Sequence, residues 1–92
     1  MSGIDIPEEM KTKYIERRKQ DYADCLAAFD KSDYETFLRI GHQLKGNASS
    51  FGFDDLGMIA TEIEHGAQLK DLSALKTSLK KFEAFLQRRT NN

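Results

Sequence analysis

The chain has 92 residues, of which 39% are hydrophobic and 32% are charged, and its formal net charge is −1. This length predicts one domain over residues 1–92, and the composition is typical of a globular protein. No apolar run approaches the ~20 residues of a membrane span, and the start lacks the basic and apolar regions of a signal peptide, so we expect a cytoplasmic protein without membrane contact.

The first helix is predicted over about residues 7–29. Pro7 is favoured at a first helical position, and Glu8 and Glu9 complement the positive end of the helix dipole. Its apolar stripe consists of Met10, Tyr14, Ile15, Arg18, Tyr22, Leu26 and Phe29. Cys25 lies on the same side and is interpreted as a buried small hydrophobic residue. The sequence leaves open whether a short extra N-terminal helix precedes this one.

The second helix is predicted over about residues 33–51. Ser32 and Glu35 have the Ser-x-x-Glu spacing of a capping box, which marks its start. Gly52 can adopt the left-handed conformation that ends a helix, so the second helix is expected to stop just before it.

Two further helices are predicted over about residues 54–69 and 71–89, with Asp54 and Asp71 as their caps and Gly66 weakening the last turn of the third helix. Their expected core residues are Leu56, Ile59, Ala60, Ile63 and Ala67, followed by Leu72, Leu75, Leu79, Phe82 and Leu86. Strand-like alternation is missing. Four amphipathic helices with short linkers predict an all-α, antiparallel up-down-up-down four-helix bundle.

His42 lies on the predicted exposed face of the second helix. The residues within about 60° of it on a helical wheel are Glu35, Arg39, Gly46 and Ser49. The apolar and small residues Tyr34, Phe37, Gly41, Leu44 and Ala48 gather on another arc. No carboxylate occurs from Thr36 to Phe53, whereas Arg39 and Lys45 both lie there, so this segment is predicted to be locally cationic.

This arrangement suits a nitrogen that takes up a phosphoryl group. A neutral imidazole has one nitrogen free to attack. Lys45, three residues on, can bring its ammonium to a phosphoryl group on the ring. Gly46 costs the helix roughly 1 kcal/mol relative to alanine, which indicates that something beside His42 needs the room. Gly41, on the buried arc, is better explained by close helix packing.

The chain resembles the histidine-containing phosphotransfer (HPt) domains of two-component phosphorelays. The residues that carry the resemblance are His42-Gln43-Leu44-Lys45-Gly46, the small residues Ala48, Ser49 and Ser50, Phe51-Gly52-Phe53, and the next helix through Leu56 and Glu64. It extends back through the helix ending near Phe29 and the Asp33-Tyr34 turn, and so covers nearly the whole chain. It implies that His42 accepts a phosphoryl group from the aspartate of one receiver domain and passes it to another, with Lys45 and Gly46 matching the auxiliary lysine and glycine of the family.

The chain is predicted to be a phosphocarrier, not an enzyme. It has no glycine-rich phosphate loop and no cluster of carboxylates near His42 to hold Mg²⁺. We therefore expect it to bind no cofactor; the resemblance implies that Mg²⁺ comes with the receiver domain of a response regulator or hybrid histidine kinase. Arg39, Gln43 and Ser49 are expected to contact that partner, and the chain is expected to be a monomer.

Three other interpretations are weaker. A metal site is not predicted, because Cys25, His42 and His65 share no ligand spacing, and His65 reads as a solvated residue. A second interpretation is a helical adaptor that binds receiver or kinase domains without being phosphorylated, but such an adaptor would have no use for His42. Nucleic-acid binding could use the six cations from Lys70 to Arg89, but the net charge is −1 and one side of that helix is needed for the core.

Overall fold

The computed structural model describes residues 6–90, which form four α-helices and one short 3₁₀ turn. The elements are α1 (Glu8–Lys31), α2 (Tyr34–Asn47), η1 (Ser49–Phe51), α3 (Asp54–Gln68) and α4 (Leu72–Thr90). The predicted all-α fold class is confirmed. α1 is continuous from Glu8 to Lys31, so a break does not divide it into a short helix and a main helix. Residues 1–5 lie outside the described range.

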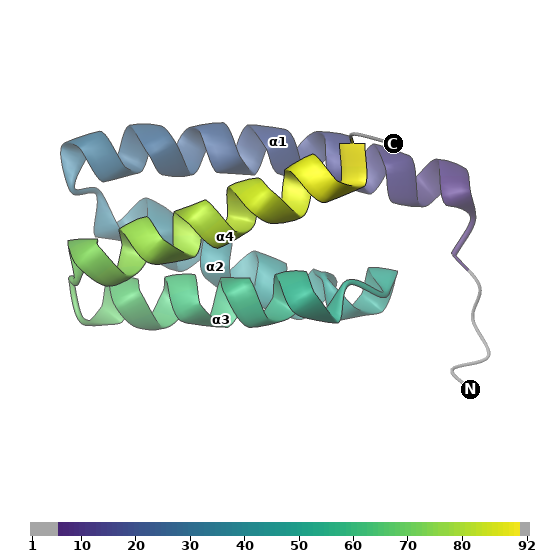
Figure 1. The fold of residues 1–92 in the computed structure, drawn as a ribbon. Helices are drawn as coiled ribbons and strands as arrows, with labels where there is room; N and C mark the ends of the chain where they lie inside the picture. The colour runs from purple at the N-terminus through teal and green to yellow at the C-terminus, as the bar shows by residue number, and fades with distance from the viewer. Residues whose placement is uncertain (1–5, 91–92) are drawn as a thin grey trace.

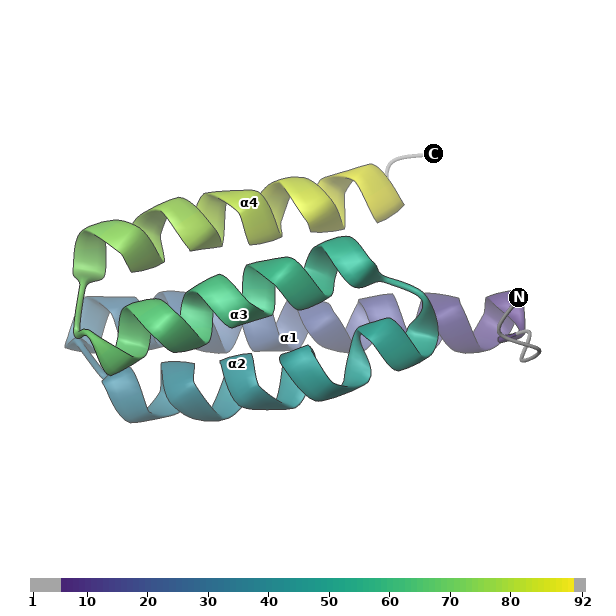
Figure 2. The same cartoon turned by 90° about the horizontal axis from the view of Figure 1, so that it is seen from below.

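The helices lie side by side, and the chain alternates in direction from each helix to the next (Figures 1 and 2). Each helix packs against its neighbour in sequence, and α4 closes the arrangement against α1. α1 is the longest helix, with 24 residues, and its N-terminal turns extend past the end of the bundle where α2 leads into η1 (Figure 2). No helix among the described residues is long and apolar enough to cross a membrane.

Asp33, and not Ser32, caps α2. The Asp33 carboxylate accepts hydrogen bonds from the Thr36 N–H at 3.2 Å and from the Thr36 hydroxyl at 2.7 Å. Ser32 instead ends α1 in the left-handed conformation, with φ 52°, and its N–H donates to the Phe29 carbonyl. The predicted Ser32–Glu35 capping box is therefore wrong, because the tight link between the helices uses Ser32 to reverse the chain.

α2 ends at Asn47 rather than near the predicted Phe51. The Ala48 carbonyl accepts from the N–H groups of Phe51 at 3.1 Å and Phe53 at 2.9 Å, which tightens the chain into η1. Gly52 then reverses the chain with φ 85°, in the left-handed conformation predicted for it.

The two predicted aspartate caps have different outcomes. Asp71 caps α4, because its Oδ1 accepts from the Ala74 N–H at 3.1 Å. Asp54 is the first residue of α3 instead of its cap, and the preceding Phe53 offers no side-chain hydrogen bond. The two carboxylates of the first turn, Asp54 and Asp55, still complement the positive end of the α3 dipole.

The core is centred on Phe37, Phe82 and Phe85, which are fully buried. All five residues predicted as the core face of α3 are buried, as is Cys25 on α1. Phe85 is missing from the predicted stripe of α4 because the buried face of that helix is wider than one residue per turn.

Two residues predicted on the α1 stripe are exposed. Met10, near the N-terminal end of α1, is 50% exposed. Leu26 is 44% exposed because Cys25 beside it takes the inward position. The other residues of the predicted α1 stripe are buried or half-buried.

Aromatic rings hold the overhanging part of α1 against η1. The Tyr14 ring stacks on Phe51 with ring centroids 4.3 Å apart, and the Tyr14 hydroxyl donates to Oδ1 of Asn47 at the end of α2. Phe53 packs edge-on against Phe85 with centroids 5.7 Å apart. Each such ring pair contributes about 0.5–1.5 kcal/mol beyond burial, so the end of α2 is fixed against both α1 and α4.

Candidate functional site

α2 presents His42 to solvent, as the helical wheel predicted. Its side chain is 74% exposed, and Glu35, Arg39 and Gly46 are exposed with it. The opposite face of the helix is buried: Phe37, Ile40, Gly41 and Leu44 pack into the core. The packed face prevents rotation of α2, so the imidazole stands at a fixed position on the surface.

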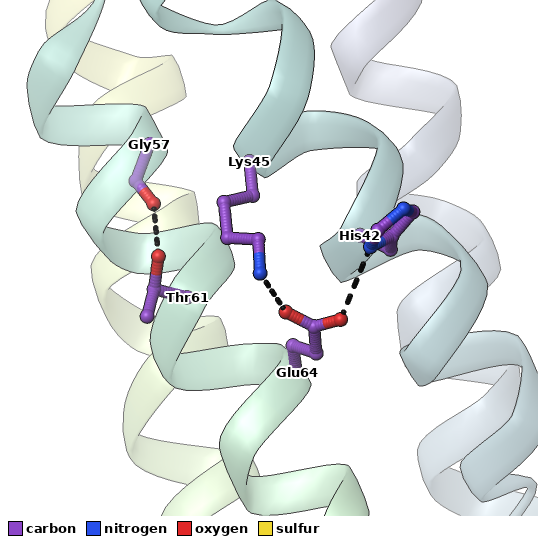
Figure 3. A network of polar contacts seen from close by, with 5 residues as sticks. All are labelled: His42, Lys45, Gly57, Thr61 and Glu64. Carbon is purple, nitrogen blue, oxygen red and sulfur yellow. Dashed lines mark hydrogen bonds and ion pairs between the residues drawn. The ribbon is translucent and has the colours of Figure 1, made fainter.

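A carboxylate from α3 lies against His42. Glu64 Oε2 is 3.3 Å from His42 Nδ1, and Glu64 Oε1 is 2.6 Å from Lys45 Nζ, so the three side chains form one network across α2 and α3 (Figure 3). The Glu64 side chain is only 15% exposed. Residues 36–53 themselves carry no carboxylate, and the carboxylate that faces His42 comes from another helix.

Glu64 is held in its charged form. The hydrogen bond from Lys45 is the main reason that the pKa of Glu64 lies below its ordinary value; partial burial opposes this shift, and the contact with His42 adds to it. A carboxylate can only accept hydrogen bonds, so the contact with His42 requires a proton on Nδ1. In the neutral ring, the lone pair is then on Nε2, which lies away from Glu64 (Figure 3).

Gly41 brings the two helices close enough for this contact. A Cβ at Gly41 would lie 2.9 Å from the Glu64 backbone nitrogen and 3.1 Å from the Ala60 carbonyl oxygen. Only glycine allows the α3 backbone to approach so closely beside His42. The interpretation of Gly41 as a packing residue agrees with this geometry.

The second glycine of this helix is in a different environment. A Cβ at Gly46 would meet nothing within 4 Å, and the residue is exposed on the same face as His42. It therefore serves no close packing among the described residues. Gly66, by contrast, is buried, and its missing Cβ would come within 3.3 Å of the Leu75 side chain.

A groove of about 820 Å³ runs beside His42 between α1 and α2. Gln43 and Gly46 line it together with residues of α1. Of the other two residues predicted to contact a partner, Arg39 and Ser49 are exposed but lie outside this groove. The sequence pattern of α2 alone gave no indication that α1 forms the opposite wall.

Two side chains to which the sequence assigned no functional role, Cys25 and His65, have the burial and exposure that were predicted. Cys25 is buried, which raises the pKa of its thiol to about 12, and His65 is exposed. Within residues 6–90, no group of three or more His, Cys, Asp or Glu side chains is placed to hold a metal ion. Several cations of α4 are paired within the chain: Lys81 with Glu62, and both Arg88 and Arg89 with Asp55.

The sequence also matches a known protein family. A family model described as the Hpt domain matches residues 9–89, which cover all of the helical fold except the first residue of α1 and the last residue of α4. The chain belongs to the Hpt domain family. The searches of curated proteins and of solved structures gave no match.

Membership explains the exposed histidine on a rigid helix. Hpt domains are helical phosphocarriers of phosphorelays that interact with receiver domains, so histidine phosphotransfer is the activity that the family indicates for this chain. In this Hpt domain, Glu64 is the site residue to which sequence reasoning assigned no role. The spacing within α3 places Glu64 on one face with Gly57 and Thr61, which lie seven and three residues before it (Figure 3). Spacing within one helix does not show that this face lies against α2, so the contact with His42 could not be predicted.

Proposed function

We propose that Nε2 of His42 accepts a phosphoryl group from the phosphoaspartate of one receiver domain and transfers it to the aspartate of another. The observation that carries this proposal is the contact of Glu64 with Nδ1, which leaves Nε2 as the free nucleophile on an exposed ring. The pairs in this network are partly exposed and contribute at most about 1 kcal/mol each to stability, so their main effect is on the orientation of the ring.

The transfer exchanges a bond from phosphorus to oxygen for a bond from phosphorus to nitrogen. The Nε2 lone pair attacks phosphorus, the bond from phosphorus to the aspartate oxygen breaks, and the aspartate leaves as a carboxylate. The imidazole becomes positively charged as the phosphorus–nitrogen bond forms. Glu64 stabilises that charge through the proton on Nδ1 and does not take part in the bond exchange. The reverse sequence delivers the phosphoryl group to the second receiver.

Mg²⁺ is proposed to act from the receiver domain. The carboxylate nearest to His42, Glu64, is already engaged by Lys45 at 2.6 Å and by the imidazole. Mg²⁺ binds through one or two carboxylates together with phosphate oxygens and water, and the carboxylate of Glu64 is already used by its two contacts on α2. Phosphoryl transfer commonly uses this ion to offset charge on the phosphate. We propose that the chain is a covalent intermediate in phosphoryl transfer, and that it acts as a monomer in the cytoplasm.

The test is direct transfer from a panel of receiver domains labelled with phosphate on their aspartate. We expect at least one receiver to transfer its phosphoryl group to this protein at short reaction times. The label should be lost in acid and retained in alkali, because a phosphorus–nitrogen bond at imidazole breaks once the ring is protonated. An acid-stable label, or no labelling by any receiver of the source organism, would contradict the proposed function.

Lys45→Ala is expected to slow phosphoryl uptake or shorten the lifetime of phosphorylated His42 while the helical content stays unchanged. The Lys45 ammonium already reaches across to Glu64 beside the ring, and a charge-assisted contact with phosphate contributes roughly 1.5–3 kcal/mol before solvent screening. Transfer rates and phosphohistidine lifetime measure the effect, with Lys45→Arg as the control that keeps the cation. Unchanged values for both in Lys45→Ala would remove Lys45 from the mechanism.

Gly46→Gln is expected to block transfer from a phosphorylated receiver while leaving the fold equally or more stable. The helix gains up to roughly 1 kcal/mol of propensity, and the Gln side chain stands in the open space beside His42. A urea melt paired with a transfer assay measures both effects. Gly46→Ala is the matched control, because it gives a similar propensity gain with little added bulk. Loss of several kcal/mol of stability in Gly46→Gln would show that the residue does not face open space.

A further inference from the structure

The two nitrogens of His42 lie toward different helices. On the α3 side, Glu64 Oε2 is 3.3 Å from Nδ1, and Lys45 Nζ is 2.6 Å from the other oxygen of the same carboxylate. Nε2 lies on the side of the ring away from Glu64 (Figure 3), and the ring lines the groove that α2 forms with α1. A phosphoryl group on Nε2 would therefore stand at the groove and not against α3.

The cations on the α1 wall of this groove differ in whether they are already paired. Arg18 is 9% exposed, and its Nε is 2.8 Å from a carboxylate oxygen of Asp21. Lys13 has a carboxylate oxygen of Glu9 at 4.0 Å, and both side chains are exposed. Arg17 is exposed, lines the groove, and forms no hydrogen bond or ion pair within residues 6–90. Its guanidinium is therefore available to an anion.

A phosphoryl group on the ring needs positive charge beside its oxygens. Such a group carries about −1.5 to −2 charges at pH 7 and three strong acceptor oxygens. The ammonium of Lys45 is shared with Glu64, and no carboxylate of residues 6–90 lines the groove on the other side of the ring. A planar guanidinium can donate two parallel hydrogen bonds to phosphate oxygens, which an ammonium cannot do. An arginine on α1 therefore suits the free side of the ring.

We infer that Arg17 binds the phosphoryl group on Nε2 of His42 from across the groove. The phosphorylated form then has a contact between α1 and α2 that the unphosphorylated form lacks. This inference rests on the proposed function, from which it takes Nε2 as the acceptor. Lys45 and Arg17 act from opposite sides of the ring, and Lys13, one turn before Arg17, adds positive charge to the same wall. The contact favours the phosphorylated state of this protein because it is made only in that state.

The first test measures how the phosphoryl group distributes at equilibrium between His42 and the aspartate of a receiver domain. In Arg17→Gln, the ratio of phosphorylated His42 to phosphorylated receiver should fall about three- to tenfold, because one charge-assisted contact with phosphate is lost at a partly exposed site. This ratio depends only on the free energies of the separate proteins. Weaker docking would slow the approach to equilibrium but would leave the ratio unchanged.

Two variants serve as controls for this measurement. Lys76→Gln also removes one exposed positive charge, but Lys76 lies on α4 and outside the groove, so the ratio should stay within about twofold of wild type because salt screens a distant charge. Arg17→Lys keeps the charge without the planar fork, so its ratio should lie between those of Arg17→Gln and wild type.

The second test uses phosphoramidate as the phosphoryl donor and needs no receiver. The Nε2 lone pair attacks phosphorus, the bond from phosphorus to the donor nitrogen breaks, and ammonia leaves. On phosphorylation of the wild-type protein, the nitrogen–proton NMR signal of the Arg17 guanidinium should shift. The corresponding signal of Arg88, which lies 3.8 Å from Asp55 and outside the groove, should stay in place.

An Arg17 signal that does not move on phosphorylation would overturn the inference, and so would a wild-type ratio in Arg17→Gln or an equal fall in Lys76→Gln. An Arg17 signal that moves after phosphoramidate treatment, without transfer from any receiver, would support the contact and refute the proposed function alone. Failure of phosphoramidate to label Nε2 of His42 would overturn both.

Discussion

His42→Gln is expected to abolish phosphoryl transfer completely and to leave the fold intact. Glutamine keeps a polar side chain on the exposed face of α2 but has no nitrogen that can hold a phosphoryl group. The site is 74% exposed, and surface substitutions of this kind usually change stability by less than about 0.5 kcal/mol. Labelling from a phosphorylated receiver measures the first effect, and circular dichroism with a urea melt measures the second.

His65→Gln is the control for this experiment. His65 is exposed on α3 next to Glu64 in sequence, but the network around His42 does not include it. We expect full labelling in His65→Gln. Full labelling in His42→Gln would place the phosphoryl group elsewhere and refute the role of His42.

Gly41→Ala is expected to destabilise the protein by about 1–3 kcal/mol, even though alanine is the better helix former. The new methyl group would lie 2.9 Å from the backbone nitrogen of Glu64, and backbone atoms cannot move aside as the end of a flexible side chain can. α2 and α3 must separate. For a domain of this size, each kcal/mol lost lowers Tm by roughly 4–8 °C, so the expected fall is about 4–24 °C.

The same separation should reduce phosphoryl transfer, because it moves Glu64 away from Nδ1 of His42. Gly46→Ala is the matched control: it is the same substitution on the same helix, where the added Cβ meets nothing within 4 Å. It should raise the free energy of unfolding by up to roughly 1 kcal/mol. Equal stability changes in the two variants would show that α2 and α3 tolerate a wider spacing at Gly41.

The helices and their buried faces were predictable because periodicity is a local property of the sequence. The third and fourth helices illustrate this, with all five predicted core residues of α3 buried. Helix ends were less predictable where two signals compete. Ser32 and Asp33 are both good capping residues, and the choice depends on how sharply the chain turns between α1 and α2, which propensity does not specify.

The part of the candidate site that lies on α2 was predictable from the sequence, and the parts on α1 and α3 were not. His42, Lys45 and Gly46 are neighbours on one helix, so their spacing brought them together before any fold was known. Glu64 and the α1 wall of the groove come from other helices, and their alignment with His42 depends on the register of helix packing. That register is set by contacts such as Gly41 against Glu64, which a wheel of a single helix does not contain.

The contact at Gly41 also limits how far the phosphoryl-acceptor motif could be transplanted. Glu64 is fixed twice by α2: its backbone rests against Gly41, and its carboxylate meets the side chains of His42 and Lys45. A five-residue segment from His42 to Gly46 grafted onto the surface of another bundle would carry the nucleophile but not its facing carboxylate. The smallest portable unit is a pair of helices in register, with a glycine immediately before the histidine.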